Sequence, residues 1–190
     1  DSALVRRAAM GLSMGATAVT IITSRFGQRS GAHMNPAVTL TYLTLGKIAW
    51  RDAVFYAAAQ FSGGILGVLL AELLIGPPLR HSAVNFAVTQ PGPSGAPPAF
   101  AAEMLISGFL MAAVLAVSNN RRTARWTPVF AGSLVAIYIT IEAPISGMSM
   151  NPARTLGSAY AANSYPALWI YFTAPPLAML AAGQVYRILK

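Results

Sequence analysis

The sequence predicts an all-α membrane protein, an inverted-repeat helical bundle of five full spans and two half-helices. Only 9% of its 190 residues are charged and 55% are hydrophobic, whereas a soluble domain carries about 25% charged residues. Five apolar stretches are long enough to cross a bilayer, which takes about 20 residues. Residues 30–40 and 146–156 share eight of eleven positions, including the tripeptide Asn-Pro-Ala. This repeat indicates two related halves within one domain.

The five expected spans contain glycine, serine and alanine, and such small residues let membrane helices approach closely. A segment rich in proline and glycine, 77–98, connects a first repeat, 1–76, to a second repeat, 99–190. We expect this segment to run over the surface of a single transmembrane domain, 1–190. The expected spans are Leu4–Thr23, Ala53–Ile75, Ala99–Val117, Thr127–Ile141 and Ala167–Tyr186.

Each Asn-Pro-Ala tripeptide lies between spans and predicts the start of a short helix. Proline suits the first helical position, where its missing N–H costs nothing, and asparagine suits the N-cap before it. The two helices should end near Gly46 and Asn163, which makes each about 15 Å long, half the hydrocarbon thickness. Three spans separate the tripeptides, so the half-helices enter from opposite faces and meet near the midplane.

Charge sets the expected orientation of the spans. If the first span starts outside, nine Lys and Arg residues lie in inner segments and four in outer segments. Positive residues favour the cytoplasmic side, so the C-terminus should be cytoplasmic. This orientation leaves the N-terminus outside without an export signal, so we expect a further span upstream of Asp1.

Composition excludes several classes of function. The chain has no cysteine, so neither a disulfide nor a thiolate metal site can form. The net charge of +8 follows from basic loops between apolar runs and does not indicate a nucleic-acid partner. We find no nucleophile and base in a catalytic pattern, no metal site and no need for a cofactor.

The two tripeptide segments, their spacing and Glu103 resemble the aquaporin, or major intrinsic protein, family, in particular its bacterial and nodulin-type members. The resemblance covers nearly the whole chain but omits the family's first span and the glutamate within it. It implies a homotetramer with one pore per subunit, in the plasma or inner membrane of the cell. Lipid would surround it, and water and small neutral solutes would pass through it.

The Asn-Pro-Ala residues have a role that follows from their chemistry. Each asparagine can cap its helix with the side-chain oxygen and leave its amide as a donor in the pore. Two helix N-termini add about half a positive charge each, which repels cations and interrupts a proton wire. The alternative is that the asparagines are simple caps. These pore residues are Asn35, Pro36, Ala37, Asn151, Pro152 and Ala153.

The resemblance also implies a ladder of backbone carbonyls in extended chain before each cap. His33 could equally be a packing histidine that holds its own loop. The residues of this ladder are Gly31, Ala32, His33, Gly147 and Ser149.

Arg154 lies directly after the second tripeptide, and the resemblance places it at the narrowest point of the pore. Arginine within a membrane is costly and usually functional, although it could instead reach lipid phosphate. The resemblance implies that the family's other constriction positions fall on Ile139 and Met148, counting back from Asn151, and on either Met14 or Gly15 in the first span. The alternative is that these residues only pack the bundle. A histidine is usual at the first of these positions in water-specific members.

Glu103 lies inside a span, where the resemblance implies that it accepts backbone N–H groups from the loop that precedes the second half-helix. Glu72 and Glu142 lie near span ends and should be interfacial. The leading interpretation is a passive channel for water, and for small uncharged solutes, that excludes protons and ions. The alternatives are a glycerol, urea or metalloid channel and a non-conducting, truncated membrane subunit.

Overall fold

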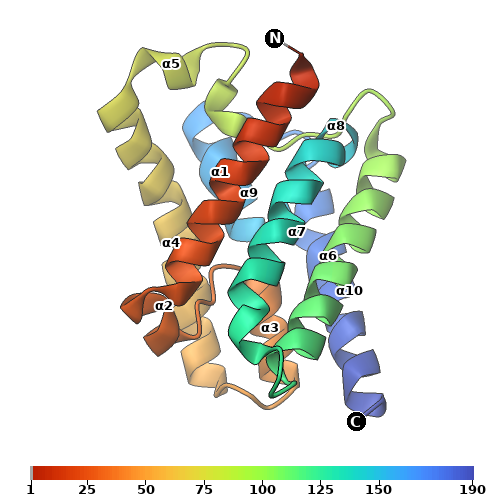
Figure 1. Cartoon of the computed structure of the whole chain (residues 1–190). Coiled ribbons are helices and arrows are strands. Elements are labelled where there is room, and N and C mark those ends of the chain that lie inside the picture. The colour runs from red at the N-terminus through yellow and green to blue at the C-terminus, as the bar shows by residue number, and fades with distance from the viewer. Residues whose placement is uncertain (1) are drawn as a thin grey trace.

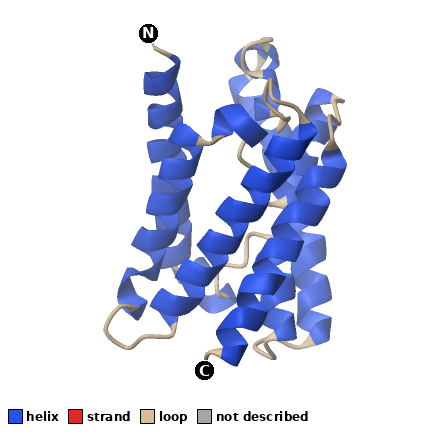
Figure 2. Cartoon of the chain, turned by 90° about the vertical axis from the view of Figure 1, so that its right-hand side faces the viewer, coloured by secondary structure: helices blue, strands red, loops and turns tan. Residues whose placement is uncertain are grey.

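The computed structural model describes residues 2–190, and that part of the chain is helical without strands (Figures 1 and 2). Both short helices begin at the predicted prolines. The elements are α1 (Ala3–Thr23), α2 (Arg25–Ser30), α3 (Pro36–Thr44), α4 (Trp50–Ile75), α5 (Pro77–Arg80), η1 (Asn85–Ala87), α6 (Ala96–Ser118), η2 (Ala124–Trp126), α7 (Thr127–Ile141), α8 (Ala143–Ser146), α9 (Pro152–Ala162) and α10 (Leu168–Ile188).

Within residues 2–190, four helical stretches are long and apolar enough to cross a membrane: Trp50–Ile75, Ala96–Ser118, Ala124–Ile141 and Leu168–Ile188. The sequence predicted five. The remaining prediction, Leu4–Thr23, does form the 21-residue helix α1, but α1 is not among these candidates. Two arginines near its start and several serine, threonine and glycine residues reduce its hydropathy. The described residues therefore contain four candidate spans, as expected of a multi-pass membrane protein.

The helices pack in pairs that connect the two halves of the chain. α1 packs along α7, and α6 packs along α10. Each half-helix packs against the span that follows the other half-helix: α3 lies on α10, and α9 lies on α4. In Figure 1, α3 occupies the lower half of the bundle and α9 the upper half. This exchange brings residues more than 100 positions apart into the middle of the molecule.

Helices α1 and α7 approach each other closely because glycines lie at their contact. A Cβ added to Gly15 would lie 2.5 Å from the carbonyl oxygen of Gly132. Gly11 contacts Ala136 one turn away in the same manner. The two backbones touch directly, as expected for membrane helices with small residues at their interface.

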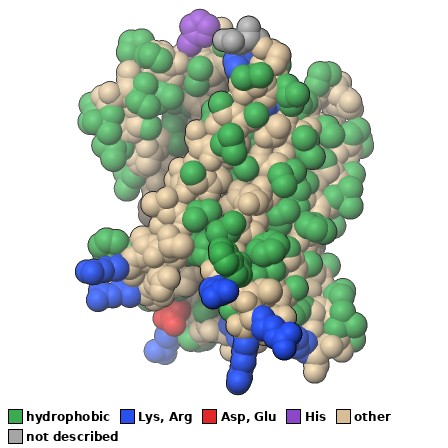
Figure 3. Space-filling view, viewed as in Figure 1, with side chains coloured by type: hydrophobic (Ala, Val, Ile, Leu, Met, Phe, Trp, Pro, Cys, Tyr) green, Lys and Arg blue, Asp and Glu red, His purple; other side chains and the backbone are tan. Residues whose placement is uncertain are grey.

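The spans α4 and α10 differ in how much of their surface is buried within the chain. Of the best apolar windows, 39% is buried in α10 and none is buried in α4. α10 has α6 alongside it, whereas no helix of the described residues takes the equivalent place on α4. Large side chains on α4 are consequently exposed, for example Phe55 at 75% and Leu73 at 81%. Apolar side chains cover the visible flank, and Lys and Arg gather at its lower end (Figure 3).

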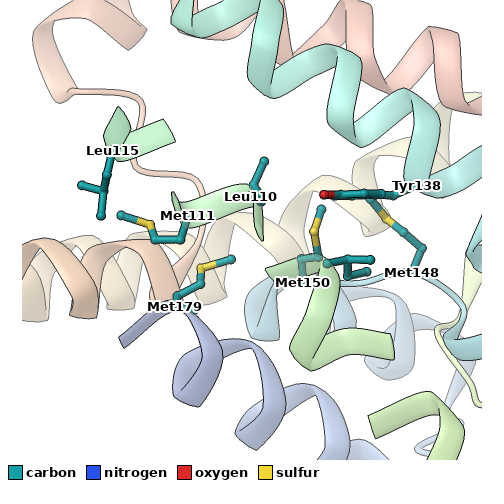
Figure 4. Packing of buried hydrophobic residues seen from close by; sticks show 9 residues of the cluster. Leu110, Met111, Leu115, Tyr138, Met148, Met150 and Met179 are labelled. Carbon is teal, nitrogen blue, oxygen red and sulfur yellow. The ribbon is translucent and has the colours of Figure 1, made fainter. Parts of the chain in front are cut away.

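The core lies where the half-helices meet α6, α7 and α10. Met148 and Met150 belong to the second loop, residues 147–151 between α8 and α9. They lie beside Tyr138 of α7 (Figure 4). Met111 and Met179 continue the cluster toward α3. The loop before α9 is thus fixed by packing as well as by hydrogen bonds.

Candidate functional site

The two asparagines cap their half-helices and are bonded to each other's loops. Asn35 Oδ1 accepts from the backbone N–H of Ala37 at 2.9 Å, and Asn151 Oδ1 accepts from that of Ala153 at 3.0 Å. Asn35 Nδ2 donates to the carbonyl of Met150 at 2.6 Å. Asn151 Nδ2 donates in return to the carbonyl of Met34 at 2.8 Å. Each amide has two N–H groups, so each crossing bond uses one and leaves one.

Part of the backbone before each cap is left-handed, where extended chain was expected from the sequence. Gly31 and Ala32 have φ of 66° and 52°, and Gly147 and Met148 have φ of 80° and 46°. Met150 is also left-handed, with φ of 55°. A residue other than glycine pays about 1–2 kcal/mol for this conformation, so such loops need external support. The sequence could not show this because methionine and alanine carry no signal for positive φ.

Glu103 on α6 supplies this support to the second loop. Its Oε1 accepts from the Ser146 hydroxyl at 2.8 Å and from the backbone N–H of Ser149 at 2.7 Å. Its Oε2 accepts from the backbone N–H of Met150 at 2.8 Å. The Tyr171 hydroxyl donates to the Ser146 carbonyl and holds the start of the loop. A completely buried carboxylate is thereby used as the acceptor for three donors.

Arg154 has a partner that the sequence analysis missed. Its Nη1 donates to the hydroxyl of Thr89, which is buried in the segment that was expected to run over the surface. The backbone N–H of Gly92 donates to the carbonyl of Ile145 at 2.9 Å, so this part of the segment folds inward. A single threonine among prolines and glycines gives no sequence signal for such a contact.

His33 is enclosed by its own half of the protein. Its ring stacks on Tyr42 and lies near Tyr56, with centroids 5.0 and 4.9 Å away. Its Nδ1 is 3.2 Å from the Thr39 hydroxyl, and its carbonyl accepts from Gln60 Nε2 at 2.6 Å. These contacts match the packing role that the sequence analysis left open beside direct pore contact.

The remaining constriction candidates occupy different environments. Met148 is buried in the core cluster, and Ile139 packs against that cluster. Gly15 faces the backbone of α7, whereas Met14 is 43% exposed. The four residues therefore differ in burial, from the buried Met148 to the partly exposed Met14.

Glu142 is buried, although it was expected to be interfacial. It follows the last residue of α7, is only 7% exposed, and neither carboxylate oxygen has a hydrogen-bond partner among the described residues. Burial raises the pKa of this carboxyl to about 7. Glu72, by contrast, pairs with Arg80 at 2.7 Å in an exposed ion pair. Among residues 2–190, no cluster of three or more His, Asp or Glu side chains could hold a metal ion.

Candidate membrane spans together with two paired, asparagine-capped short helices define a class of helical, multi-pass membrane proteins. The sequence pattern of the family described as major intrinsic protein matches residues 3–186. The chain belongs to this family, which consists of channels and not of enzymes.

Curated relatives and a solved structure agree with this assignment. A putative aquaporin NIP4-1 from Arabidopsis thaliana is 34% identical over 90% of this chain and 59% of its own length. Aquaporin NIP6-1 from the same plant is 37% identical over 91% of this chain and 55% of its own length. Aquaporin NIP2-1 from Oryza sativa subsp. japonica is 36% identical over 100% of this chain and 62% of its own length. The chain thus spans about three fifths of the relatives that it matches.

The crystal structure of an aquaglyceroporin from Plasmodium falciparum has the same fold. It superimposes with a TM-score of 0.70 over 95% of both chains, at 20% sequence identity.

Proposed function

We propose that the protein is a passive channel for water and small uncharged solutes that excludes protons and ions. The crossing bonds of Asn35 and Asn151 carry this proposal, because they hold the N-termini of both half-helices together in the middle of the bundle. Each amide keeps one N–H for the oxygen of a passing water molecule. The two helix ends add positive potential at the same point and oppose cations.

The wider architecture that we propose is an inverted repeat, with 1–76 and 99–190 as its halves and 77–98 as the connection. The placement of α3 and α9 in opposite halves of the bundle supports it. Lys and Arg residues at one end support a cytoplasmic C-terminus in the plasma or inner membrane. We further propose a homotetramer, which native mass spectrometry in detergent would test.

Arg154 is the proposed polar group of the constriction, held in place by Thr89. Ile139 and Met148 are its proposed apolar neighbours. Of the two candidates on α1, the packing of Gly15 against α7 supports Met14 as the fourth residue. A filter with one arginine and three apolar side chains is less polar than one that contains a histidine.

This apolar filter favours a second candidate function, a channel mainly for neutral solutes such as glycerol. Stopped-flow light scattering of proteoliposomes in a glycerol gradient separates the two. Fast shrinkage followed by re-swelling at the rate of empty liposomes would indicate a water channel that rejects glycerol. Fast shrinkage with fast re-swelling would indicate passage of small neutral solutes. Shrinkage and re-swelling that are both no faster than those of empty liposomes would contradict both.

A further inference from the structure

The turn between α6 and α7, residues 119–126, carries a concentration of exposed positive charge. Arg121, Arg122 and Arg125 all have exposed side chains. None of them forms an ion pair in the described part of the chain, where Arg80 pairs with Glu72. Three guanidinium groups within five residues are therefore without a neutralising partner among residues 2–190.

The backbone of this turn is fixed by its uncharged polar side chains. The Thr123 hydroxyl donates to the carbonyl of Val117 in the last turn of α6 at 2.9 Å. Asn120 Oδ1 accepts from the backbone N–H of Arg122 at 2.9 Å, and the Asn120 carbonyl accepts from that of Ala124 at 2.8 Å. A surface that is already ordered loses less conformational freedom when it binds a ligand.

The turn connects two candidate membrane spans and lies at their common end. α6 ends at Ser118, and α7 begins at Thr127. Trp126 is 48% exposed, and the Cζ atom of Arg125 lies 5.3 Å from the centroid of its ring. Tryptophan is typical of the level in a bilayer where the headgroups lie. The arginines are thus held beside the headgroups and not far out in the water.

The end of α10 adds to this charge. α10 packs along α6, and the C-terminal ends of both helices lie at the lower end of the bundle (Figure 1). The exposed Arg187 and Lys190 belong to these last residues. Among the described acidic residues, Asp52 near the start of α4 lies at this end. The potential around the turn is therefore strongly positive.

We propose that residues 119–126 bind the headgroup of an anionic phospholipid, with Arg121 and Arg122 on its phosphate and Trp126 between the headgroup and the acyl chains. A guanidinium group binds phosphate through two parallel N–H donors. Charge complementarity favours an anionic over a zwitterionic lipid, since the turn offers no acid to a choline or ammonium group. This interaction surface goes beyond the proposed channel function and does not depend on it.

A phospholipid fits this surface better than a soluble phosphate ester. The three arginines are exposed, so the turn does not enclose a small anion, whereas the bilayer itself holds a lipid at this level. Each basic residue close to an anionic membrane surface strengthens binding roughly fivefold. Removal of all three should weaken binding of an anionic lipid at least tenfold, and about 100-fold if their contributions add.

The test is native mass spectrometry of the detergent-solubilised protein with phosphatidylglycerol and phosphatidylcholine of the same acyl chains. The turn variant is Arg121→Gln/Arg122→Gln/Arg125→Gln. The matched control is Arg25→Gln/Arg29→Gln/Arg51→Gln, which removes three exposed arginines elsewhere, one of them also stacked on a tryptophan. Both variants lose the same charge, so a difference between them reports the site.

We expect the wild type and the control to prefer phosphatidylglycerol and the turn variant to bind it at least tenfold more weakly, with phosphatidylcholine binding unchanged. A wild type without this preference, an unaltered turn variant, or equal losses in both variants would overturn the inference. Displacement of the lipid by an equal concentration of sn-glycerol 3-phosphate would identify a soluble phosphate as the ligand and would overturn it too.

A second measurement covers the case in which the turn variant does not fold. The preference of the wild type should decrease as the concentration of ammonium acetate rises, because exposed charges are screened by salt. A preference that is independent of salt would contradict binding by these arginines. Water permeability in proteoliposomes is measured separately, so the lipid site and the channel function can fail independently.

Discussion

The three hydrogen bonds that Glu103 accepts from the loop before α9 should contribute to the free energy of unfolding of the protein. In Glu103→Gln the amide oxygen can replace Oε1, but the NH₂ group then faces the backbone N–H of Met150. One donor loses its acceptor and is left buried, because Met150 is only 3% exposed. The bonds from Ser146 and Ser149 remain but no longer involve a charged acceptor.

The cost can be worked out from these contacts. A hydrogen bond to a charged group is worth about 1.5–3 kcal/mol, and an orphaned buried donor costs about 1–3 kcal/mol. Glutamine is less costly to bury than a carboxylate, which offsets part of this loss. We expect a net destabilisation of about 2–3 kcal/mol. For a chain of this size that corresponds to a thermal midpoint roughly 4–12 °C lower.

The assay is thermal unfolding in detergent, followed by circular dichroism, together with water permeability in proteoliposomes. Glu72→Gln is the matched control, because its carboxylate pairs with Arg80 at the surface and should cost less than about 1 kcal/mol. Equal midpoints for the two variants would refute the argument that Glu103 supports a strained loop. A lower midpoint with wild-type permeability would show that the loop tolerates the lost bond.

Two further predictions concern packing and the filter. Gly15→Ala places a methyl group against Gly132 and should destabilise by about 1–3 kcal/mol, whereas Gly67→Ala has open space and should not lower the thermal midpoint. Thr89→Val removes the hydroxyl that Arg154 contacts and should raise glycerol permeability relative to water, whereas Thr89→Ser keeps the hydroxyl and should resemble the wild type. An unchanged ratio in the valine variant would contradict a filter role for this pair.

The half-helices could be predicted from sequence because their signals are local. Pro36 and Pro152 begin them, and Asn35 and Asn151 cap them, as the tripeptide chemistry indicates. Their ends also fall within about two residues of Gly46 and Asn163. Capping and proline geometry depend on neighbours in the chain, which a single sequence contains.

Contacts between distant segments could not be predicted in the same way. Thr89 meets Arg154 across 65 positions, and nothing in its surroundings distinguishes it from a surface threonine. Glu142 looks interfacial because it follows a span, and only the three-dimensional structure shows that it is buried. The left-handed backbone at Met148 likewise depends on the acceptors that α6 supplies to the next two residues.

Asn35 and Asn151 each have two roles, which the sequence alone does not distinguish. Each caps its own half-helix and donates a hydrogen bond to the loop before the other half-helix. In Asn35→Asp the carboxylate can still cap α3, since aspartate is as good an N-cap as asparagine and its charge favours a helix N-terminus. It cannot donate to the Met150 carbonyl, and it places a negative charge beside that oxygen. If Asn35 were only a cap, the variant would be as stable as the wild type. If the crossing bond joins the half-helices, the thermal midpoint and the water permeability should both fall, and Asn35→Asp combined with Asn151→Asp should cost less than the sum of the single changes. Additive costs would mean that the two helix ends are held independently.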